Sequence, residues 1–176
     1  MAFTYGTINK CISADGSANN IYEVRFGYEL QSQDTENNTS TIKLQLEVRS
    51  TSSSYKPYGY SQTTTIDGTT LASATYDLRS TNVWQIFGTR TIVVNHNEYG
   101  EYTATKTGSF TSNVSGGRPK FGTASVSFTL PTIPMQSVRI KVNGSWKRAF
   151  PYVRVNGSWK KATAYIRVSG SWKRGS

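Results

Sequence analysis

The stretch Tyr22-Glu-Val-Arg-Phe-Gly-Tyr-Glu-Leu30 decides the fold, because apolar side chains occupy every second position along it. A second stretch, Ile42-Lys-Leu-Gln-Leu-Glu-Val48, repeats the pattern. Successive side chains of a strand point to opposite faces, so each stretch predicts a strand with one buried and one solvated face. The polar residues 34–38 between them have the composition of a hairpin turn, which predicts an antiparallel pair.

Outside these two stretches, the rest of residues 1–134 has the pattern of short strands joined by turns. Asp67-Gly68 marks a tight turn, and residues 113–121 are typical of a loop. Only 17% of the chain is charged, and its Thr, Ser, Asn and Gly content favours strands over helices. Further strands are expected near residues 3–13, 61–66, 71–78, 83–95, 101–111 and 122–130. Roughly seven or eight strands at this spacing predict a two-sheet antiparallel β-sandwich.

Residues 97–104, Asn-Glu-Tyr-Gly-Glu-Tyr-Thr-Ala, resemble the tyrosine corner of immunoglobulin-like sandwiches. In that motif a turn with Gly leads into a strand whose first Tyr bonds back to the backbone, and Tyr102 fits this role. Ala104 stands where an antibody domain has its second cysteine, and the single Cys11 allows no intrachain disulfide. Trp84 is a candidate for the large core aromatic. The first domain is therefore predicted to be an all-β, immunoglobulin-like antiparallel β-sandwich.

Residues 135–176 form a separate tail of three 13-residue repeats that align without gaps. The aligned segments are Val138–Arg148, Pro151–Lys161 and Ala164–Arg174, in which Trp146, Trp159 and Trp172 recur at one position and Gly144, Gly157 and Gly170 at another. Asn-Gly between strand-forming flanks is a strong hairpin signal, because both residues accept the positive φ of a type I′ turn. We therefore predict three short β-hairpin repeats, with the three glycines as structural residues.

The two-residue loop Asn156-Gly157 also sets the register of its hairpin. Arg154 then faces Trp159 across the strands, and Tyr152 lies on the same face. The same count places Lys141 opposite Trp146 and Arg167 opposite Trp172, and a cation over an exposed indole contributes about 0.5–1 kcal/mol. An isolated hairpin is marginal in water, so we expect the three to stack together or to add to another chain. The candidate partner-binding residues are Lys141, Trp146, Tyr152, Arg154, Trp159, Tyr165, Arg167 and Trp172.

The net charge of +10 belongs entirely to the tail, since residues 1–134 hold ten Lys and Arg and ten Asp and Glu. Cations with Trp and Tyr suit nucleic acid, but these cations lie on both hairpin faces, so nucleic acid is not the partner we expect. Tyr55, Tyr58 and Tyr60 cluster in Tyr-Lys-Pro-Tyr-Gly-Tyr, and aromatic rings can stack on sugars. A host cell-wall glycan is therefore a candidate partner.

The sequence offers no constellation for catalysis. His96 is the single histidine, at the end of a predicted strand, and we expect a structural role for it and a core position for Cys11. No phosphate-binding loop, dinucleotide fingerprint, zinc spacing or calcium loop occurs. We expect no enzymatic activity, catalytic residue, metal or cofactor. No apolar run is long enough for a signal peptide or a membrane span, so we expect synthesis in the bacterial cytoplasm and no membrane association.

With these residues described, the chain resembles structural proteins of tailed bacteriophages, of the kind found in siphophages of Gram-positive hosts. Gly122–Pro134 is similar to the close of an immunoglobulin-like module in minor phage structural proteins. Tyr152–Ala162, Tyr-Val-Arg-Val-Asn-Gly-Ser-Trp-Lys-Lys-Ala, is similar to C-terminal repeats of phage tail and baseplate proteins. The resemblance implies a virion protein that binds other virion proteins, as a homo-oligomer within a symmetric assembly, with host-surface contact as a further candidate role.

Three hypotheses follow. In the first, the chain is a structural protein of the phage tail or baseplate, whose hairpins dock on a partner or on symmetry copies. In the second, it is a glycan-binding adhesin module. In the third, it decorates a capsid, and its positive tail meets an acidic capsid surface.

Overall fold

The computed structural model describes residues 2–97, 99–134, 138–162 and 164–174, and every regular element in them is a β-strand. Ten of the strands form one antiparallel sheet. They are β1 (Thr4–Tyr5), β2 (Asn9–Ser13), β3 (Ala18–Asp34), β4 (Thr39–Ser50), β5 (Tyr58–Ile66), β6 (Thr69–Thr70), β7 (Ala74–Asp77), β8 (Gln85–Asn95), β9 (Thr103–Ser112) and β10 (Pro119–Thr129). The prediction of an all-β antiparallel fold is confirmed.

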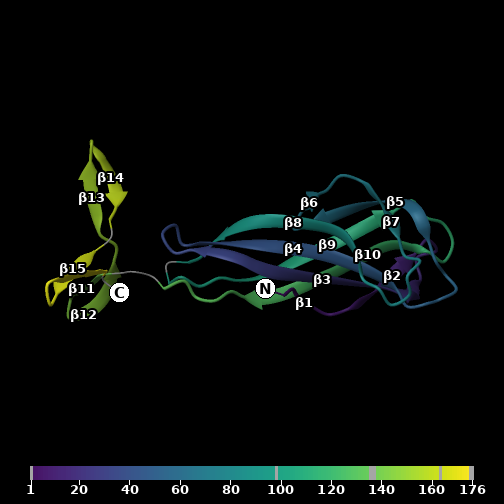
Figure 1. The fold of residues 1–176 in the computed structure, drawn as a ribbon, viewed down its shortest axis with the longest axis horizontal. Coiled ribbons are helices and arrows are strands. Elements are labelled where there is room, and N and C mark those ends of the chain that lie inside the picture. Colours follow the sequence, from purple (N-terminus) through teal and green to yellow (C-terminus); the bar gives the residue numbers. More distant parts are fainter. Residues whose placement is uncertain (1, 98, 135–137, 163, 175–176) are drawn as a thin grey trace.

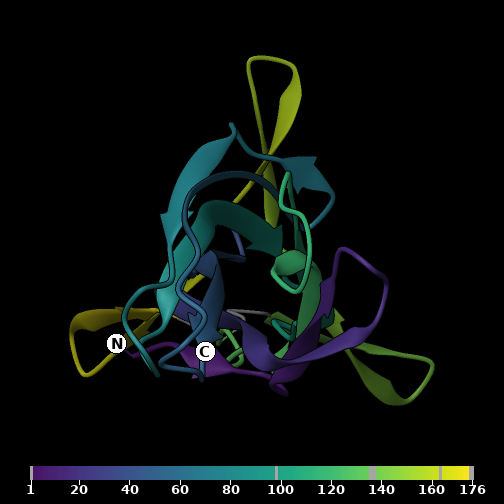
Figure 2. The same ribbon diagram turned by 90° about the vertical axis from the view of Figure 1, so that its right-hand side faces the viewer.

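The ten strands belong to one continuous sheet and not to the two separate sheets that the sequence predicted. This sheet, called the sandwich below, curls around its core so that two layers face each other (Figure 2). Its strand order is β6-β5-β9-β10-β2-β3-β4-β8, with β1 beside β3 and β7 beside β5. Seen along the long axis, the strands encircle the centre of the molecule (Figure 2). Side chains bridge the gap between β5 and β8, where the Gln62 amide and the Thr64 hydroxyl each donate to the Phe87 carbonyl at 2.9 Å.

The core is made by the alternating residues that the sequence singled out. The fully buried hydrophobic side chains of β3 and β4 are Tyr22, Val24, Phe26, Ile42, Leu44, Leu46 and Val48. The opposite layer adds aromatic rings: Phe110 of β9 lies edge-on to Phe87 at 4.8 Å, and Phe128 of β10 stacks on Tyr28 at 3.9 Å. The turn at 35–38 joins β3 and β4 as predicted, so the period-two interpretation holds for this pair.

The immunoglobulin-like strand order is not confirmed. In a constant-type immunoglobulin sheet the second strand pairs with the first and the fifth. Here β3 pairs with β2 and with the next strand along the chain, β4. The reason is local: two strictly alternating stretches separated by a short polar turn pair most directly with each other.

One finer prediction about an aromatic residue is not tested, and another is wrong. The Tyr102 ring packs near His96 and Phe128, but the backbone just upstream, to which its hydroxyl is predicted to bond, includes residue 98, which lies outside the described residues. Trp84 lies outside the core on a charged sheet face, with the guanidinium carbons of Arg25 and Arg49 at 4.2 and 4.5 Å from its ring centroid. Spacing along the chain could not distinguish these surroundings from buried ones.

The tail contains three two-stranded sheets. They are β11 (Val138–Val142) with β12 (Ser145–Ala149), β13 (Tyr152–Val155) with β14 (Ser158–Lys161), and β15 (Tyr165–Val168) with β16 (Ser171–Arg174). Among the described residues, no tail strand joins the ten-stranded sheet. Figure 1 shows the hairpins beyond the end of the sandwich at which β10 finishes.

Gly108 of β9 allows the two layers to approach closely. A Cβ at this position would lie 2.5 Å from Cδ2 of Phe26 and 3.1 Å from Cδ1 of Leu46. Both neighbours are fully buried, so neither can move aside without repacking the core.

We predict that Gly108→Ala lowers the free energy of unfolding by about 1–3 kcal/mol, because the added methyl overpacks the core. Chemical denaturation of the full chain measures this. Gly117→Ala is the matched control, since a Cβ there meets no atom within 4 Å. Equal midpoints for the two variants would contradict the packing argument.

Candidate functional site

The hairpin turns have the conformation that their sequences require. Asn156 and Gly157 have φ values of 49° and 80°, and the first hairpin is alike. In the third hairpin Ser169 takes the Asn position with φ of 49°, next to Gly170 at 83°. Two successive positive φ values define a type I′ turn. The register is the predicted one, with Lys141 opposite Trp146, Arg154 opposite Trp159 and Arg167 opposite Trp172.

The predicted cation–indole stacking does not follow from this register in the second and third hairpins. Arg154 donates its Nε to the carbonyl of Gly157 at 3.3 Å, and Arg167 does the same toward Gly170 at 3.4 Å. Each guanidinium therefore hydrogen-bonds a backbone carbonyl in the turn of its own hairpin. Trp159 and Trp172 remain 69% and 68% exposed. The side chain of Trp146 lies outside the described residues.

In the second hairpin every strand side chain is exposed, on both faces, and in the first hairpin Val142 and Ala149 are half-buried. In the second hairpin Tyr152 and Trp159 are exposed on one face and Val153 and Val155 on the other. Tyr165 and Lys141, the remaining predicted contact residues, are exposed as well. A two-stranded sheet with no covered face is marginally stable alone. The arrangement therefore presents apolar surface, cations and open strand edges to a neighbour.

A second feature lies at the opposite end of the sandwich from the tail, around the start of β5 in Figure 1. It is a pocket of about 390 Å³, here called the tyrosine pocket. Its lining residues are Tyr22, Ser54, Tyr55, Lys56, Pro57, Tyr58, Tyr60, Gly117 and Arg118. The sequence pointed to Tyr55, Tyr58 and Tyr60, whereas Tyr22 and Arg118 reach the pocket from β3 and from the loop between β9 and β10.

The polar groups of the tyrosine pocket are positioned by neighbouring backbone. The Tyr22 hydroxyl donates to the Tyr55 carbonyl at 3.4 Å, and burial raises the pKa of Tyr22 to about 12, so it remains protonated at neutral pH. The Arg118 guanidinium lies 5.1 Å from the Tyr60 ring centroid and donates to the Ser115 carbonyl at 3.4 Å. Tyr58 is 61% exposed, with Arg79 at 4.0 Å from its ring centroid.

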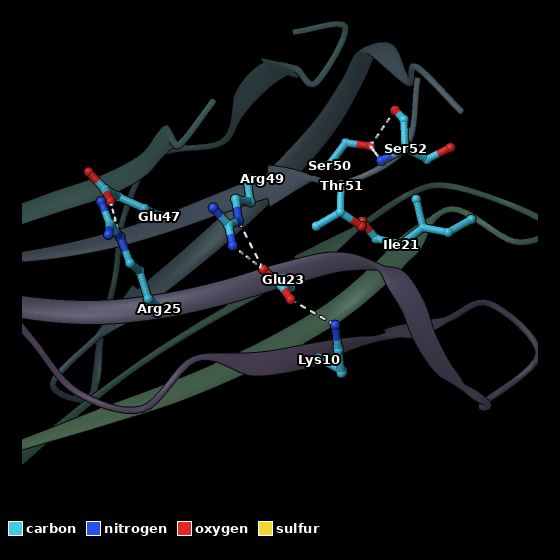
Figure 3. A network of polar contacts seen from close by, with 9 residues as sticks. All are labelled: Lys10, Ile21, Glu23, Arg25, Glu47, Arg49, Ser50, Thr51 and Ser52. Carbon is cyan, nitrogen blue, oxygen red and sulfur yellow. Dashed lines mark hydrogen bonds and ion pairs between the residues drawn. The ribbon is translucent and has the colours of Figure 1, made fainter. Parts of the chain in front are cut away.

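The face of β2, β3 and β4 that points away from the core carries a row of ion pairs (Figure 3). Glu23 accepts from Lys10 at 2.7 Å and from Arg49 at 2.7 Å, while Arg25 pairs with Glu47 at 2.6 Å. The hydrogen bond from Lys10, together with that from Arg49, lowers the pKa of Glu23. These charges neutralise one another across adjacent strands. The ion pairs therefore stabilise the pairing of the strands and are not a candidate ligand site.

His96 and Cys11 are both used by the fold. His96 is buried, with its Nδ1 at 2.7 Å from the Gly100 carbonyl and its Nε2 at 2.7 Å from the Ser40 hydroxyl. Nδ1–H then donates to the carbonyl, and Nε2 accepts from the hydroxyl. Burial raises the pKa of the Cys11 thiol, which makes it a poor nucleophile.

Two absences concern the described residues alone. No three His, Cys, Asp or Glu side chains among them gather closely enough to hold a metal ion. They also contain no helix of the length and apolarity that crossing a membrane requires.

The fold and these surfaces define a class of protein: an all-β antiparallel module joined to basic hairpins with exposed tryptophans. The chain belongs to the family described as "Siphovirus protein of unknown function (DUF859)", whose model matches residues 15–168. The match runs from the turn after β2 to the end of β15, so it includes both parts of the chain. Comparisons with curated proteins and with solved structures found no match.

We predict that Ser169→Asn increases the population of the third hairpin, because Asn tolerates a left-handed backbone that costs most other residues about 1–2 kcal/mol. Cross-strand backbone contacts between Val168 and Ser171, measured by NMR on the full chain, report it. Asn156→Ser is the matched control and should loosen the second hairpin. No change in either hairpin would show that the turn residue does not limit hairpin formation.

We also predict a pH effect from Glu23. The pKa of the Glu23 carboxyl is lower in the folded chain than in the unfolded chain. Its ion pairs therefore stabilise the fold at pH values above the pKa that Glu23 has when unfolded, and this stabilisation is lost as the pH falls through its folded-state pKa. Glu23→Gln should lower the free energy of unfolding by about 1–2 kcal/mol at pH 7 and flatten its decline between about pH 5 and pH 3. Denaturation curves at several pH values test this, with Glu36→Gln on the exposed hairpin turn as the control. Parallel pH profiles for wild type and Glu23→Gln would contradict it.

Proposed function

We propose that this chain is a non-enzymatic structural protein of the siphovirus particle, which assembles through its hairpin tail. The observation that carries the proposal is the exposure of Trp159 and Trp172 on hairpins whose described side chains are exposed. Surface of this kind is stabilised when a neighbour covers it. Membership of a siphovirus family supports a partner within the virion.

The chemistry of the tail indicates what such a partner looks like. Residues 135–176 hold ten Lys and Arg and no acid, so an acidic protein surface is the complementary one. Each hairpin also has two open edges, to which a strand of another chain can be added. Aromatic and Arg side chains at the centre of a contact contribute most of its binding energy. The partners are other virion proteins, including further copies of this chain in a symmetric assembly.

The position in the particle that we propose is the tail or baseplate, with capsid decoration as the alternative. The basic tail is the feature that favours capsid decoration, because its positive charge complements an acidic capsid surface. His96 and Cys11 support a non-enzymatic role, because hydrogen bonding and burial occupy them in the fold. Immunogold labelling of purified particles separates the two locations.

We predict that a phage encoding the double variant Trp159→Ser, Trp172→Ser incorporates at least tenfold less of this protein into particles, as expected for two lost hot-spot residues. Quantitative mass spectrometry of purified virions measures incorporation. Lys160→Ser, an exposed position beside Trp159, is the matched control and should be incorporated normally.

Deletion of residues 135–176 should abolish incorporation while the remaining sandwich stays folded, which its circular dichroism would show. Incorporation of the truncated chain at the wild-type level would overturn the docking role of the tail.

A further inference from the structure

We propose that the tyrosine pocket is a binding site for an anionic saccharide, that is, a sugar chain carrying phosphate or carboxylate groups. The site lies at the other end of the sandwich from the hairpins, so this proposal stands whether or not the hairpins dock as proposed. Its volume of about 390 Å³ lies within the roughly 300–1,000 Å³ range of small-molecule sites.

The rings of the pocket suit a sugar in shape and polarity. Tyr55 and Tyr58 are 55% and 61% exposed, which leaves ring surface for the C–H face of a pyranose. Tyrosine adds a hydroxyl beside each apolar surface, and its rigid side chain loses little entropy on binding. The Ser54 side chain adds a hydrogen-bonding group to the lining, whereas the fully buried Tyr22 holds the Tyr55 carbonyl in place through its hydroxyl.

The charges of the pocket indicate that the sugar is anionic. Arg118 and Lys56 line it, and no acidic side chain is among the described lining residues. Within the described chain no ion pair engages Arg118, whose hydrogen bond to the Ser115 carbonyl is long at 3.4 Å. A guanidinium in this situation can offer its planar pair of N–H groups to a phosphate or a carboxylate. Arg79, in contrast, forms an ion pair with Asp77 at 2.7 Å, so its charge is neutralised and it only packs beside the Tyr58 ring.

Nucleic acid is the other polyanion that aromatic rings and cations bind. A site for it has a positive groove that follows several phosphates. The tyrosine pocket supplies two cations in one place, and residues 1–134 are neutral overall. These features favour one or a few charged sugar units over a nucleic acid strand.

The test uses the full-length chain and an array of phosphodiester-linked oligosaccharides, uronic acid oligosaccharides and their neutral counterparts, with a single-stranded thymidine oligonucleotide as a further probe. We expect at least one of the two anionic classes to bind at least tenfold more tightly than its neutral counterpart, and the responding class identifies the charged group. Arg118→Gln should weaken this binding by about 10–100-fold, as expected for the loss of a charge-assisted hydrogen bond. Arg118→Lys should recover part of it.

Tyr55→Ala should weaken the same binding about tenfold, whereas Tyr99→Ala, similarly exposed at 51% but in the turn between β8 and β9, should leave it unchanged. Unchanged melting temperatures establish that the variants are folded. The proposal is overturned if no anionic saccharide binds better than a neutral one, if Arg118→Gln and Tyr55→Ala bind like wild type, or if the oligonucleotide binds as tightly through the same residues.

Discussion

Burial of one face of the β3–β4 hairpin is the constraint on which the rest of this structure depends. Seven hydrophobic side chains of these two strands are fully buried, and their transfer from water is worth roughly 10–20 kcal/mol. A register slip of one residue would turn Glu23, Arg25 and Glu47 toward the apolar core instead, so the pairing of the two strands is strongly specified. The opposite layer then packs against Phe26, where there is no room for a Cβ at Gly108 of β9.

The same constraint determines where function can lie. One face of the β3–β4 hairpin lies in the core, and ion pairs that satisfy one another cover the other face. Binding residues can therefore lie at the ends of the long strands, in the loops and in the tail. The 17 residues of β3 alone extend about 55 Å, from the tyrosine pocket at one end to the exit of the tail at the other. A contact made by the hairpins and a ligand held by the tyrosines are therefore far enough apart to occur together.

The hairpin tail follows a different physical rule from the sandwich. Its turns are specified locally, by residues that accept positive φ, and its strands need no distant partner to reach their register. The described side chains have no core to enter, so Arg154 finds the nearest acceptor, the carbonyl of its own turn, and Trp159 remains uncovered. A segment that folds locally and keeps its apolar side chains exposed is suited to completing its burial against another molecule.

The sequence by itself determined the features that depend on neighbours along the chain: the alternating strands of the β3–β4 hairpin, the I′ turns and the pairing of Arg154 with Trp159. These follow from side-chain period and backbone φ, which a few adjacent residues control. Tertiary structure alone decided which strands became neighbours, that Trp84 lies on the charged face, and that Tyr22 and Arg118 join Tyr55 and Tyr58 around one pocket. Such contacts join residues tens of positions apart, and the packing of two whole layers selects them. No local pattern distinguishes a tyrosine in a pocket from one on an open surface.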